Sequence, residues 1–397
     1  RNQSAPAERE QWSGEPGEHE DRQLREHRAI MPRKSQLVSI VAATRSYELW
    51  AGRQVALVRA DLAFKHEQMA LAPFPFLRST FYRWVQAWEA TCPELASAPK
   101  VLAVGDLHTE NFGTWRDSEG RLVWGINDFD EAFPMAYTND LARLATSARL
   151  SISAGTLVLT PRAACNAILE GYRSSIRRGG RPFVLAEQHP VLRHDAASEL
   201  RDPVRFWTGM ADLPPARRPM AAAVALLRRQ FRTTEDPRYV TRRAGLGSLG
   251  HPRIVAIAEH SGGWIAREAK QLVGSGVAWA MGSSAAVPIH YPTIVRRAVR
   301  CADPFLEIRG RWVLRRLAPD CSRIEFTVAR LAAEQTELLH AMGAETANVH
   351  IGSGAARIAA VSRDLEQRSP TWLKVASRAM ERVTTDDYLD WHRAQRG

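Results

Sequence analysis

The sequence has few cysteines, no long apolar run and almost no lysine. The chain of 397 residues contains four widely spaced cysteines, Cys92, Cys165, Cys301 and Cys321. Neither a disulfide scaffold nor a zinc site of the C-x-x-C type is therefore expected. No apolar segment reaches the length of a membrane-spanning helix, and the first residues lack the pattern of a secretion signal. We expect a cytoplasmic protein with no membrane contact.

Arginine supplies nearly all of the basic charge. The formal net charge is +11, and lysine occurs only at Lys34, Lys65, Lys100, Lys270 and Lys374. Such arginines commonly decorate solvated surfaces. The alternative is an anionic partner, because a guanidinium binds phosphate in a bidentate manner. No known nucleic-acid-binding motif accompanies the charge, so nucleic acid is not expected as a partner.

Apolar spacing and turn residues predict a mixed α+β protein. Residues 1–34 are too polar to form a core, and we expect a loosely ordered tail. Helical spacing dominates 35–88 and 139–232, and Asn139 or Asp140 is a candidate N-cap. Alternating short apolar runs predict a strand-rich region over 239–317, with Trp264 and Trp312 in its core.

The first chemical motif is Gly105-Asp106-Leu107-His108-Thr109-Glu110-Asn111, followed by Asn127-Asp128-Phe129-Asp130 after a predicted hairpin. Transfer of a phosphoryl group requires a carboxylate near the attacking hydroxyl, with an amide and a second carboxylate for magnesium. The spacing lets Asp106 and Asn111 point into one cleft, to which the hairpin returns Asp128. Taken singly, each residue is also a common turn former or cap.

The second motif is glycine-rich and contains Gly245, Gly247, Ser248 and Gly250. A G-x-G-x-x-G pattern alone is weak, because dinucleotide folds, kinases and plain turns share it. Here a strand-like segment follows the motif, whereas a dinucleotide fingerprint opens a helix. This favours a phosphate-covering turn between two strands, with a simple hairpin turn as the alternative.

The strand-like segment WIAREAK offers two cations that could hold phosphates, Arg267 and Lys270. Being three residues apart, they would face opposite sides of a regular strand. Arg267 fits the strand pattern and Lys270 is the chemically usual residue, so both remain candidates. Both could also be surface charges.

The two motifs resemble those of aminoglycoside phosphotransferases and protein kinases, which carry H-G-D-x-H-x-x-N and I-D-F. The resemblance implies that Asp106 is the catalytic base and that Asn111 and Asp128 bind magnesium. It also implies that Asp140 anchors the catalytic loop. Val104 stands where the family's leading histidine is common.

More specifically, the chain resembles an uncharacterised, mainly bacterial, kinase-like family catalogued as a domain of unknown function. The resemblance covers roughly residues 40–390 and includes KHEQMALAPFPFLRS, GDLHTENFG, NDFDEAF, REAK and AMGAETANVHIG. Ser79 stands where relatives tend to have glycine, and Arg267 where lysine is usual.

This resemblance implies a two-lobed, protein-kinase-like fold with circularly permuted motif order, because the catalytic loop precedes the glycine turn. The expected segments are the tail, a helical lobe carrying the catalytic loop, a β-rich nucleotide lobe, and C-terminal helices that complete the helical lobe: 1–34, 35–235, 236–320 and 321–397. Termini of compact domains often lie close together, which makes such permutation tolerable.

The resemblance implies an ATP- and Mg²⁺-dependent phosphotransferase that acts on a hydroxyl of a small-molecule, possibly anionic, acceptor. The alternatives are an AMP-transferring enzyme of the same fold and a non-catalytic ATP-binding regulator. His108, Asp130, Asp140 and Arg78 are supporting candidates, although His108 and Arg78 also fit structural or surface roles. His350 fits a packed or solvated helix histidine better than a cleft residue. The sequence indicates neither the acceptor nor the oligomeric state.

Overall fold

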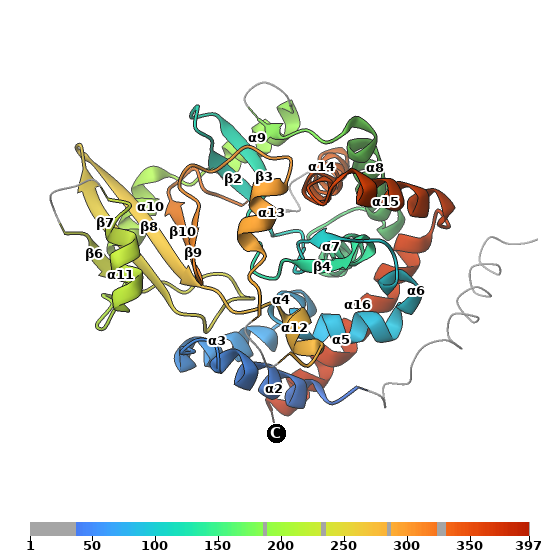
Figure 1. The fold of residues 1–397 in the computed structure, drawn as a ribbon, viewed down its shortest axis with the longest axis horizontal. Helices are drawn as coiled ribbons and strands as arrows, with labels where there is room; N and C mark the ends of the chain where they lie inside the picture. Colours follow the sequence, from blue (N-terminus) through green and yellow to red (C-terminus); the bar gives the residue numbers. More distant parts are fainter. Residues whose placement is uncertain (1–36, 186–188, 232–235, 284–286, 324–330, 397) are drawn as a thin grey trace, which may run out of the picture. The chain divides into compact units, whose positions relative to one another are not determined.

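The computed structural model describes residues 37–185, 189–231, 236–283, 287–323 and 331–396. The chain divides into two units, Arg1–Leu37 and Val38–Gly397, and the elements below belong to the second. The expected tail over 1–34 lies outside the described residues. The fold is a mixture of α-helices and small antiparallel sheets, in agreement with the predicted α+β class (Figure 1).

The first group of helices precedes the motif of residues 105–130 or lies between it and the glycine-rich motif. They are α2 (Ile40–Gly52), α3 (Arg59–Met69), α4 (Pro73–Ser79), α5 (Phe81–Thr91), α6 (Pro93–Ala96), α7 (Tyr137–Ser153), α8 (Pro161–Arg178), α9 (Pro190–Glu199), α10 (Pro203–Ala211) and α11 (Ala221–Arg228). The later helices are α12 (Gly276–Ala280), α13 (Tyr291–Arg297), α14 (Ala332–Ile351), α15 (Ala355–Gln367) and α16 (Trp372–Ala394).

The largest sheet has five antiparallel strands in the order β6-β7-β8-β10-β9. Their bounds are β6 (Arg238–Val240), β7 (Arg253–His260), β8 (Gly263–Gln271), β9 (Glu307–Arg309) and β10 (Trp312–Leu317). Alternation places Val255, Ile257 and Ala266 under α10, whereas Ile254, Ala256 and Ala269 pack with residues of α11 on the other face. The strand-rich region predicted over 239–317 is therefore confirmed, with α12 and α13 inserted between β8 and β9.

Two smaller sheets carry the motif of residues 105–130. Strands β2 (Phe112–Arg116), β3 (Leu122–Ile126) and β5 (Phe183–Val184) form one, and β1 (Lys100–Ala103) pairs with β4 (Phe133–Ala136) in the other. Strands β2 and β3 form the hairpin predicted between the two parts of the motif, with Phe112 opposite Ile126. The loop after β1 and the loop after β3 consequently enter the same region.

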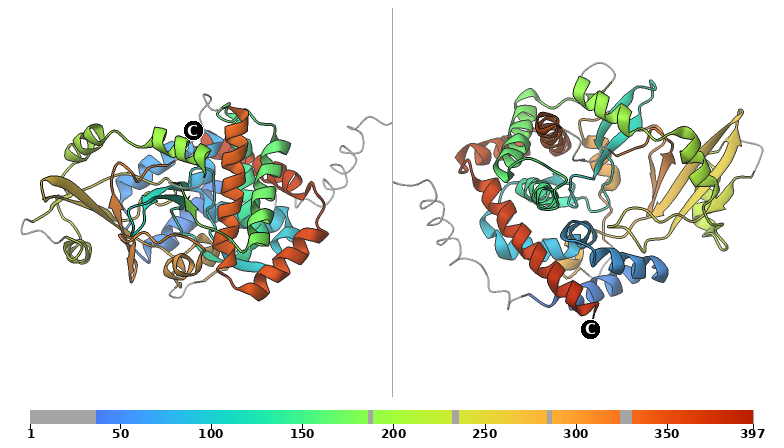
Figure 2. Two further views of the ribbon diagram at one scale, coloured as in Figure 1. Left: turned by 90° about the horizontal axis from the view of Figure 1, so that it is seen from above. Right: turned by 180° about the vertical axis from the view of Figure 1, so that it is seen from behind.

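Helices α7, α8 and α14 form the centre of the helical part, and α16 packs along α7 and the N-terminal helices (Figures 1 and 2). Helices α8 and α14 approach closely at Gly171 and Gly343. A Cβ atom at Gly171 would lie 1.8 Å from the carbonyl oxygen of His340. These glycines therefore allow backbone-to-backbone packing that a larger residue would prevent.

Two local predictions are wrong. Helix α7 begins at Tyr137 with Ala136 as N-cap, so Asn139 and Asp140 lie in its first turn. Strand β4 runs directly into this helix, which leaves no room for a later cap. Trp264 is 54% exposed, because it lies near the tip of the β7–β8 hairpin, whereas Trp312 is buried as predicted. All four cysteines are free.

Candidate functional site

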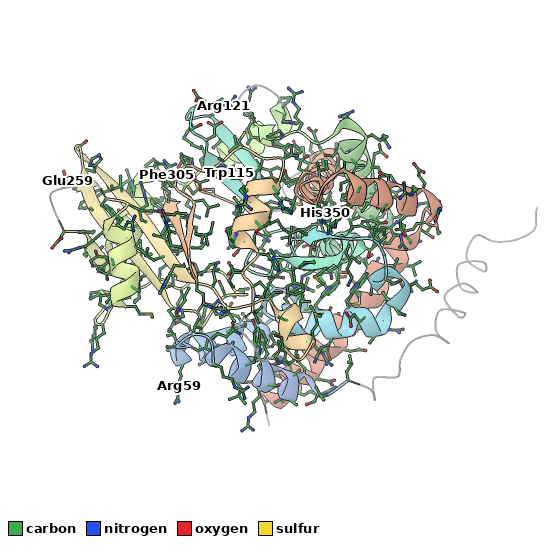
Figure 3. All side chains as sticks on the ribbon, in the orientation of Figure 1. Arg59, Trp115, Arg121, Glu259, Phe305 and His350 are labelled. Atoms are coloured by element: carbon green, nitrogen blue, oxygen red, sulfur yellow. The ribbon has the colours of Figure 1, made fainter. Side chains whose placement is uncertain are left out.

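The loop after β1 is anchored by the side chain of Asp140, a fully buried residue of α7. Its carboxylate accepts hydrogen bonds from the backbone N–H groups of Val104, at 2.7 Å, and Gly105, at 3.0 Å. Nε2 of His350 lies 3.0 Å from the same carboxylate, and Nδ1 of His350 lies 2.9 Å from the Tyr172 hydroxyl. His350 on α14 therefore lies outside the pocket lining, as predicted, and of the packed and solvated positions left open it takes the packed one (Figure 3).

Glycine is required at the start of this loop. Gly105 has a φ of +84°, in the left-handed region, and a Cβ there would lie 2.4 Å from the carbonyl oxygen of Glu131. The chain can therefore turn sharply at Gly105 and bring Asp106 beside the segment 128–131.

Asp106 is held by Arg143, which lies one helical turn after Asp140 on α7. Nε of Arg143 donates to Oδ1 of Asp106 at 2.9 Å. Nη2 of Arg143 donates to the same oxygen and to the carbonyl oxygen of Leu77. Burial raises the pKa of Asp106, and the guanidinium of Arg143 opposes this rise. Arg143 therefore fixes the orientation of the Asp106 carboxylate through Oδ1 and leaves Oδ2 outside these hydrogen bonds.

Asn111 links the loop after β1 to the loop after β3. Its amide nitrogen donates to the carbonyl oxygens of Asp106, at 3.3 Å, and Asp128, at 3.1 Å. Its amide oxygen accepts from the backbone N–H of Asp128 at 3.1 Å. One buried side chain therefore sets the separation between Asp106 and Asp128, and its oxygen keeps a lone pair for a further partner.

Lys270 of β8 reaches the carboxylates that follow β3. Its Nζ atom lies 3.2 Å from Oδ2 of Asp128 and 2.6 Å from Oδ2 of Asp130. Burial works to raise the pKa of Asp128, but Lys270 and Asp130 bring it below its ordinary value. Burial and the adjacent Asp128 carboxylate raise the pKa of Asp130. Asp128 therefore loses its proton at a lower pH than Asp130.

Arg267 does not join this cluster. Its guanidinium stacks at 4.3 Å over the ring of Phe305 and donates to the carbonyl of Ala266 (Phe305 is labelled in Figure 3). Burial lowers the pKa of Arg267 to about 10. Of the two cations that the strand pattern offered, the structure brings only Lys270 to Asp128.

The glycine-rich segment lies between β6 and β7 and faces Asp106. Gly245 and Gly250 have positive φ angles of 72° and 93°. A Cβ at Gly247 would lie 3.1 Å from Oδ2 of Asp106 and 3.2 Å from the carbonyl oxygen of Arg78. The hydroxyl of Ser248 accepts a hydrogen bond from Arg253 at 3.1 Å. The turn thus approaches the carboxylate with no side chain between them.

One pocket unites most of the predicted residues. Those that line it are Arg78, Asp106, His108, Asn111, Asp128, Asp130, Gly245, Gly247 and Ser248. Gly250, Arg267, Lys270 and Asp140 lie outside this lining, although Lys270 and Asp140 contact residues that belong to the pocket or its loop. His108 is buried, with Nδ1 accepting from the backbone of Glu110, and burial holds its pKa well below the usual range.

Three residues in or behind the pocket were not predicted from the sequence. Lys65 lines the pocket, and Arg143 and Glu268 support it from outside the lining. Glu268 is fully buried and binds the guanidinium groups of Arg253, Arg315 and Arg242. Two sequence features point to these residues. Lysine is scarce in the chain, which makes Lys65 a candidate, and Arg143 lies three positions after Asp140 on the same predicted helix.

Part of the chain is similar to a described protein family. Residues 57–202 match the model of a family described as an uncharacterised protein conserved in bacteria, DUF2252. No curated protein and no solved structure matches the chain. Among the residues that the structure describes, no helix combines the length and apolar character needed to cross a bilayer.

Proposed function

We propose that this chain is an ATP- and Mg²⁺-dependent phosphotransferase that acts on a hydroxyl group of a small-molecule acceptor. The observation that carries the proposal is the convergence of Asp106, Asn111, Asp128 and the glycine turn around one pocket, with Lys270 bound to Asp128 from outside the lining. Phosphoryl transfer relies on positioning and on charge stabilisation, and these groups supply both.

The topology of the five-stranded sheet supports a protein-kinase-like fold. The glycine turn joins β6 to β7, the lysine lies on the third strand β8, and the helices α12 and α13 precede β9 and β10. In protein kinases a glycine-rich loop covers the phosphates and the lysine that grips them lies on the third strand. The catalytic loop precedes this sheet in the sequence, so the proposed arrangement is circularly permuted.

Asp106 would orient the acceptor hydroxyl and take its proton. The acceptor oxygen forms a bond to the terminal phosphorus of ATP while the bond from that phosphorus to the bridging oxygen of ADP breaks. Burial raises the pKa of Asp106, which makes the carboxylate a better proton acceptor. The hydrogen bonds from Arg143 keep its orientation during the step.

The carboxylates fit a magnesium ion that is completed by the nucleotide. No group of three or more His, Cys, Asp and Glu side chains suited to a metal occurs in the described ranges. Magnesium commonly uses one or two protein carboxylates and takes its other ligands from phosphates and water. Asp128 and Asn111 would hold it, and Oδ1 of Asp130 is buried without a hydrogen-bond partner in the described part of the chain. When bound, the ion would neutralise charge on the phosphates.

The basic side chains near Asp106 support an anionic acceptor. Arg78 lines the pocket and pairs with Glu110, which also lies 3.5 Å from Arg323. Nε of Arg78 is buried and finds no hydrogen-bond partner among the described residues. A carboxylate or phosphate on the acceptor would satisfy this donor.

Mass analysis of products tests the proposal. The protein, ATP and magnesium would be incubated with hydroxyl-bearing phosphates and carboxylates, with ADP release measured in parallel. We expect one acceptor to gain the mass of a phosphoryl group, and Asp128→Ala to lose about 10³-fold or more of the rate while keeping its circular dichroism spectrum. The exposed Asp212→Ala is the matched control and should retain full activity.

The other outcomes identify the alternatives. Gain of an AMP group would show nucleotidyl transfer. Thermal stabilisation by ATP and magnesium without ADP release would indicate a non-catalytic regulator. Full activity in Asp128→Ala would contradict the role assigned to that carboxylate.

A further inference from the structure

Lys65 is a buried lysine that does not belong to the residues with a role in the proposed reaction. It lies on α3, is 3% exposed and lines the same pocket as Asp106. Its ammonium donates to the carbonyl oxygen of Gly247 at 3.2 Å and lies 5.9 Å from the centre of the Tyr82 ring. No carboxylate in the described part of the chain forms an ion pair with it.

This environment leaves the ammonium incompletely satisfied. An ammonium carries three donor hydrogens, and the bond to Gly247 uses one. Burial lowers the pKa of Lys65, and the more distant carboxylates of Glu48, Glu131 and Asp106 oppose that effect. Removing a charge from water without a direct counter-ion is costly, so such a residue is common where a ligand supplies the missing charge.

Helix α3 holds Lys65 in a fixed place relative to the glycine turn. The backbone N–H of Val58, the N-cap of α3, donates to the carbonyl of Gly250 at 2.8 Å. Leu62 packs so closely that a Cβ at Gly250 would lie 2.5 Å from its side chain. Asp61 pairs with Arg243, just before the turn, at 2.8 Å. Three contacts therefore attach the helix to both sides of the turn.

Gly247 lies next to both Lys65 and Asp106. Its carbonyl accepts from Lys65, and its Cα faces Oδ2 of Asp106, where a Cβ would lie 3.1 Å away. Asp106 must stand beside the hydroxyl that attacks the terminal phosphorus. The anionic group that fits between Asp106, Gly247 and Lys65 is then the one being transferred.

We infer that Lys65 binds the terminal phosphoryl group of ATP and is a catalytic residue supplied by α3. The inference rests on the proposed function. It assigns separate tasks to the two buried lysines, because Lys270 lies against Asp128 on the metal side. Charge that develops on the transferred group would be stabilised by Lys65 in a site with little water.

Nucleotide affinities of three variants distinguish this role from a structural one. Titration calorimetry with Mg·ATP and Mg·ADP would be applied to the wild type, Lys65→Met, Lys65→Gln and the exposed control Lys100→Met. Lys65→Gln keeps a donor for the Gly247 carbonyl but has no charge. We expect both Lys65 variants to lose about tenfold or more of the preference for ATP over ADP, with affinity for ADP within about twofold of the wild type.

The melting temperature supplies a second readout. Lys65→Met replaces a buried charge by an apolar side chain of similar length, so its melting temperature should equal or exceed that of the wild type. An unchanged preference for ATP would overturn the assignment of Lys65 alone. Equal losses for ATP and ADP with a lower melting temperature would show a structural role and overturn it as well. A wild type that binds neither nucleotide would overturn both this inference and the proposed function.

Discussion

At the scale of single residues, the proposed chemistry depends on how Arg143 holds Asp106. Arg143 is fully buried, and its guanidinium stacks on the rings of Phe81, at 5.2 Å, and Trp84, at 4.9 Å. The planar group can contact a ring face and a carboxylate together, which an ammonium cannot do in the same way. Arg143 is therefore a positioning residue, acting through Asp106.

Replacing Arg143 by lysine should slow turnover with little effect on nucleotide binding. We expect kcat to fall by about 10²-fold because the carboxylate loses its fixed orientation, while KM for ATP stays nearly unchanged. Loss of the guanidinium should also raise the pKa of Asp106 and move the acid limb of the rate profile to higher pH. Arg149→Lys, on the same helix but paired with Glu381, is the control. Unchanged kcat and an unmoved acid limb would contradict this role.

The sequence predicted which residue types form the site better than it predicted which way the side chains on β8 face. Asp106, Asn111 and Asp128 form short motifs whose spacing predicts convergence, and they do converge. The choice between Arg267 and Lys270 depends on which face of β8 meets the helical part. Pairing of Ala269 with Ile254 and Leu314 sets that face, and pairing partners distant in sequence are not visible from local alternation.

At the scale of elements, helix α14 supports the loop after β1 and the loop after β3. His350 contacts Asp140 beneath the loop, and Glu345 accepts from the backbone N–H of Ile126 at 3.2 Å, directly before Asn127 and Asp128. Gly125 leaves space for this contact, because a Cβ there would lie 2.3 Å from the Glu345 carboxyl. Burial raises the pKa of Glu345 to about 7.

This shift makes stability depend on pH in a defined direction. The unfolded carboxyl has a pKa of 4.5 and the folded one about 7. Between these values the folded state binds more protons, so its contribution to stability falls as pH rises and levels off above 7. Relative to the wild type, Glu345→Gln should therefore gain about 3 kcal/mol in unfolding free energy between pH 4.5 and pH 8.

Urea denaturation at pH 4.5, 6 and 8 measures this difference. The control is Glu337→Gln, which changes an exposed carboxyl on the same helix. A difference between Glu345→Gln and the wild type that stays constant with pH, or that shrinks as pH rises, would contradict the predicted charge state.

Element types were easier to predict than their ends. Helical spacing found α7, but its first turn is set by strand β4, which runs into Tyr137 without a capping side chain. Asp140 consequently serves the loop after β1 instead of capping its own helix. Similarly, the pattern around Trp264 indicates a strand, whereas exposure depends on its place near a hairpin tip.

At the scale of the whole described unit, the candidate site is assembled from segments that are distant in sequence. Lys65 comes from α3, Asp106 and Asn111 from the loop after β1, Asp128 from the loop after β3, and Lys270 from β8. Local patterns predicted the motifs, but the contact of Lys65 with the glycine turn forms only when the chain is folded. The same is true of His350, which reaches Asp140 across 210 positions.

The most direct test is a crystal structure with magnesium and a non-hydrolysable ATP analogue. We predict a metal ion about 2.1 Å from an oxygen of Asp128, with the triphosphate beneath residues 245–250 and its terminal phosphate beside Asp106. A nucleotide bound outside this pocket, or a metal ion that does not contact Asp128, would contradict the account.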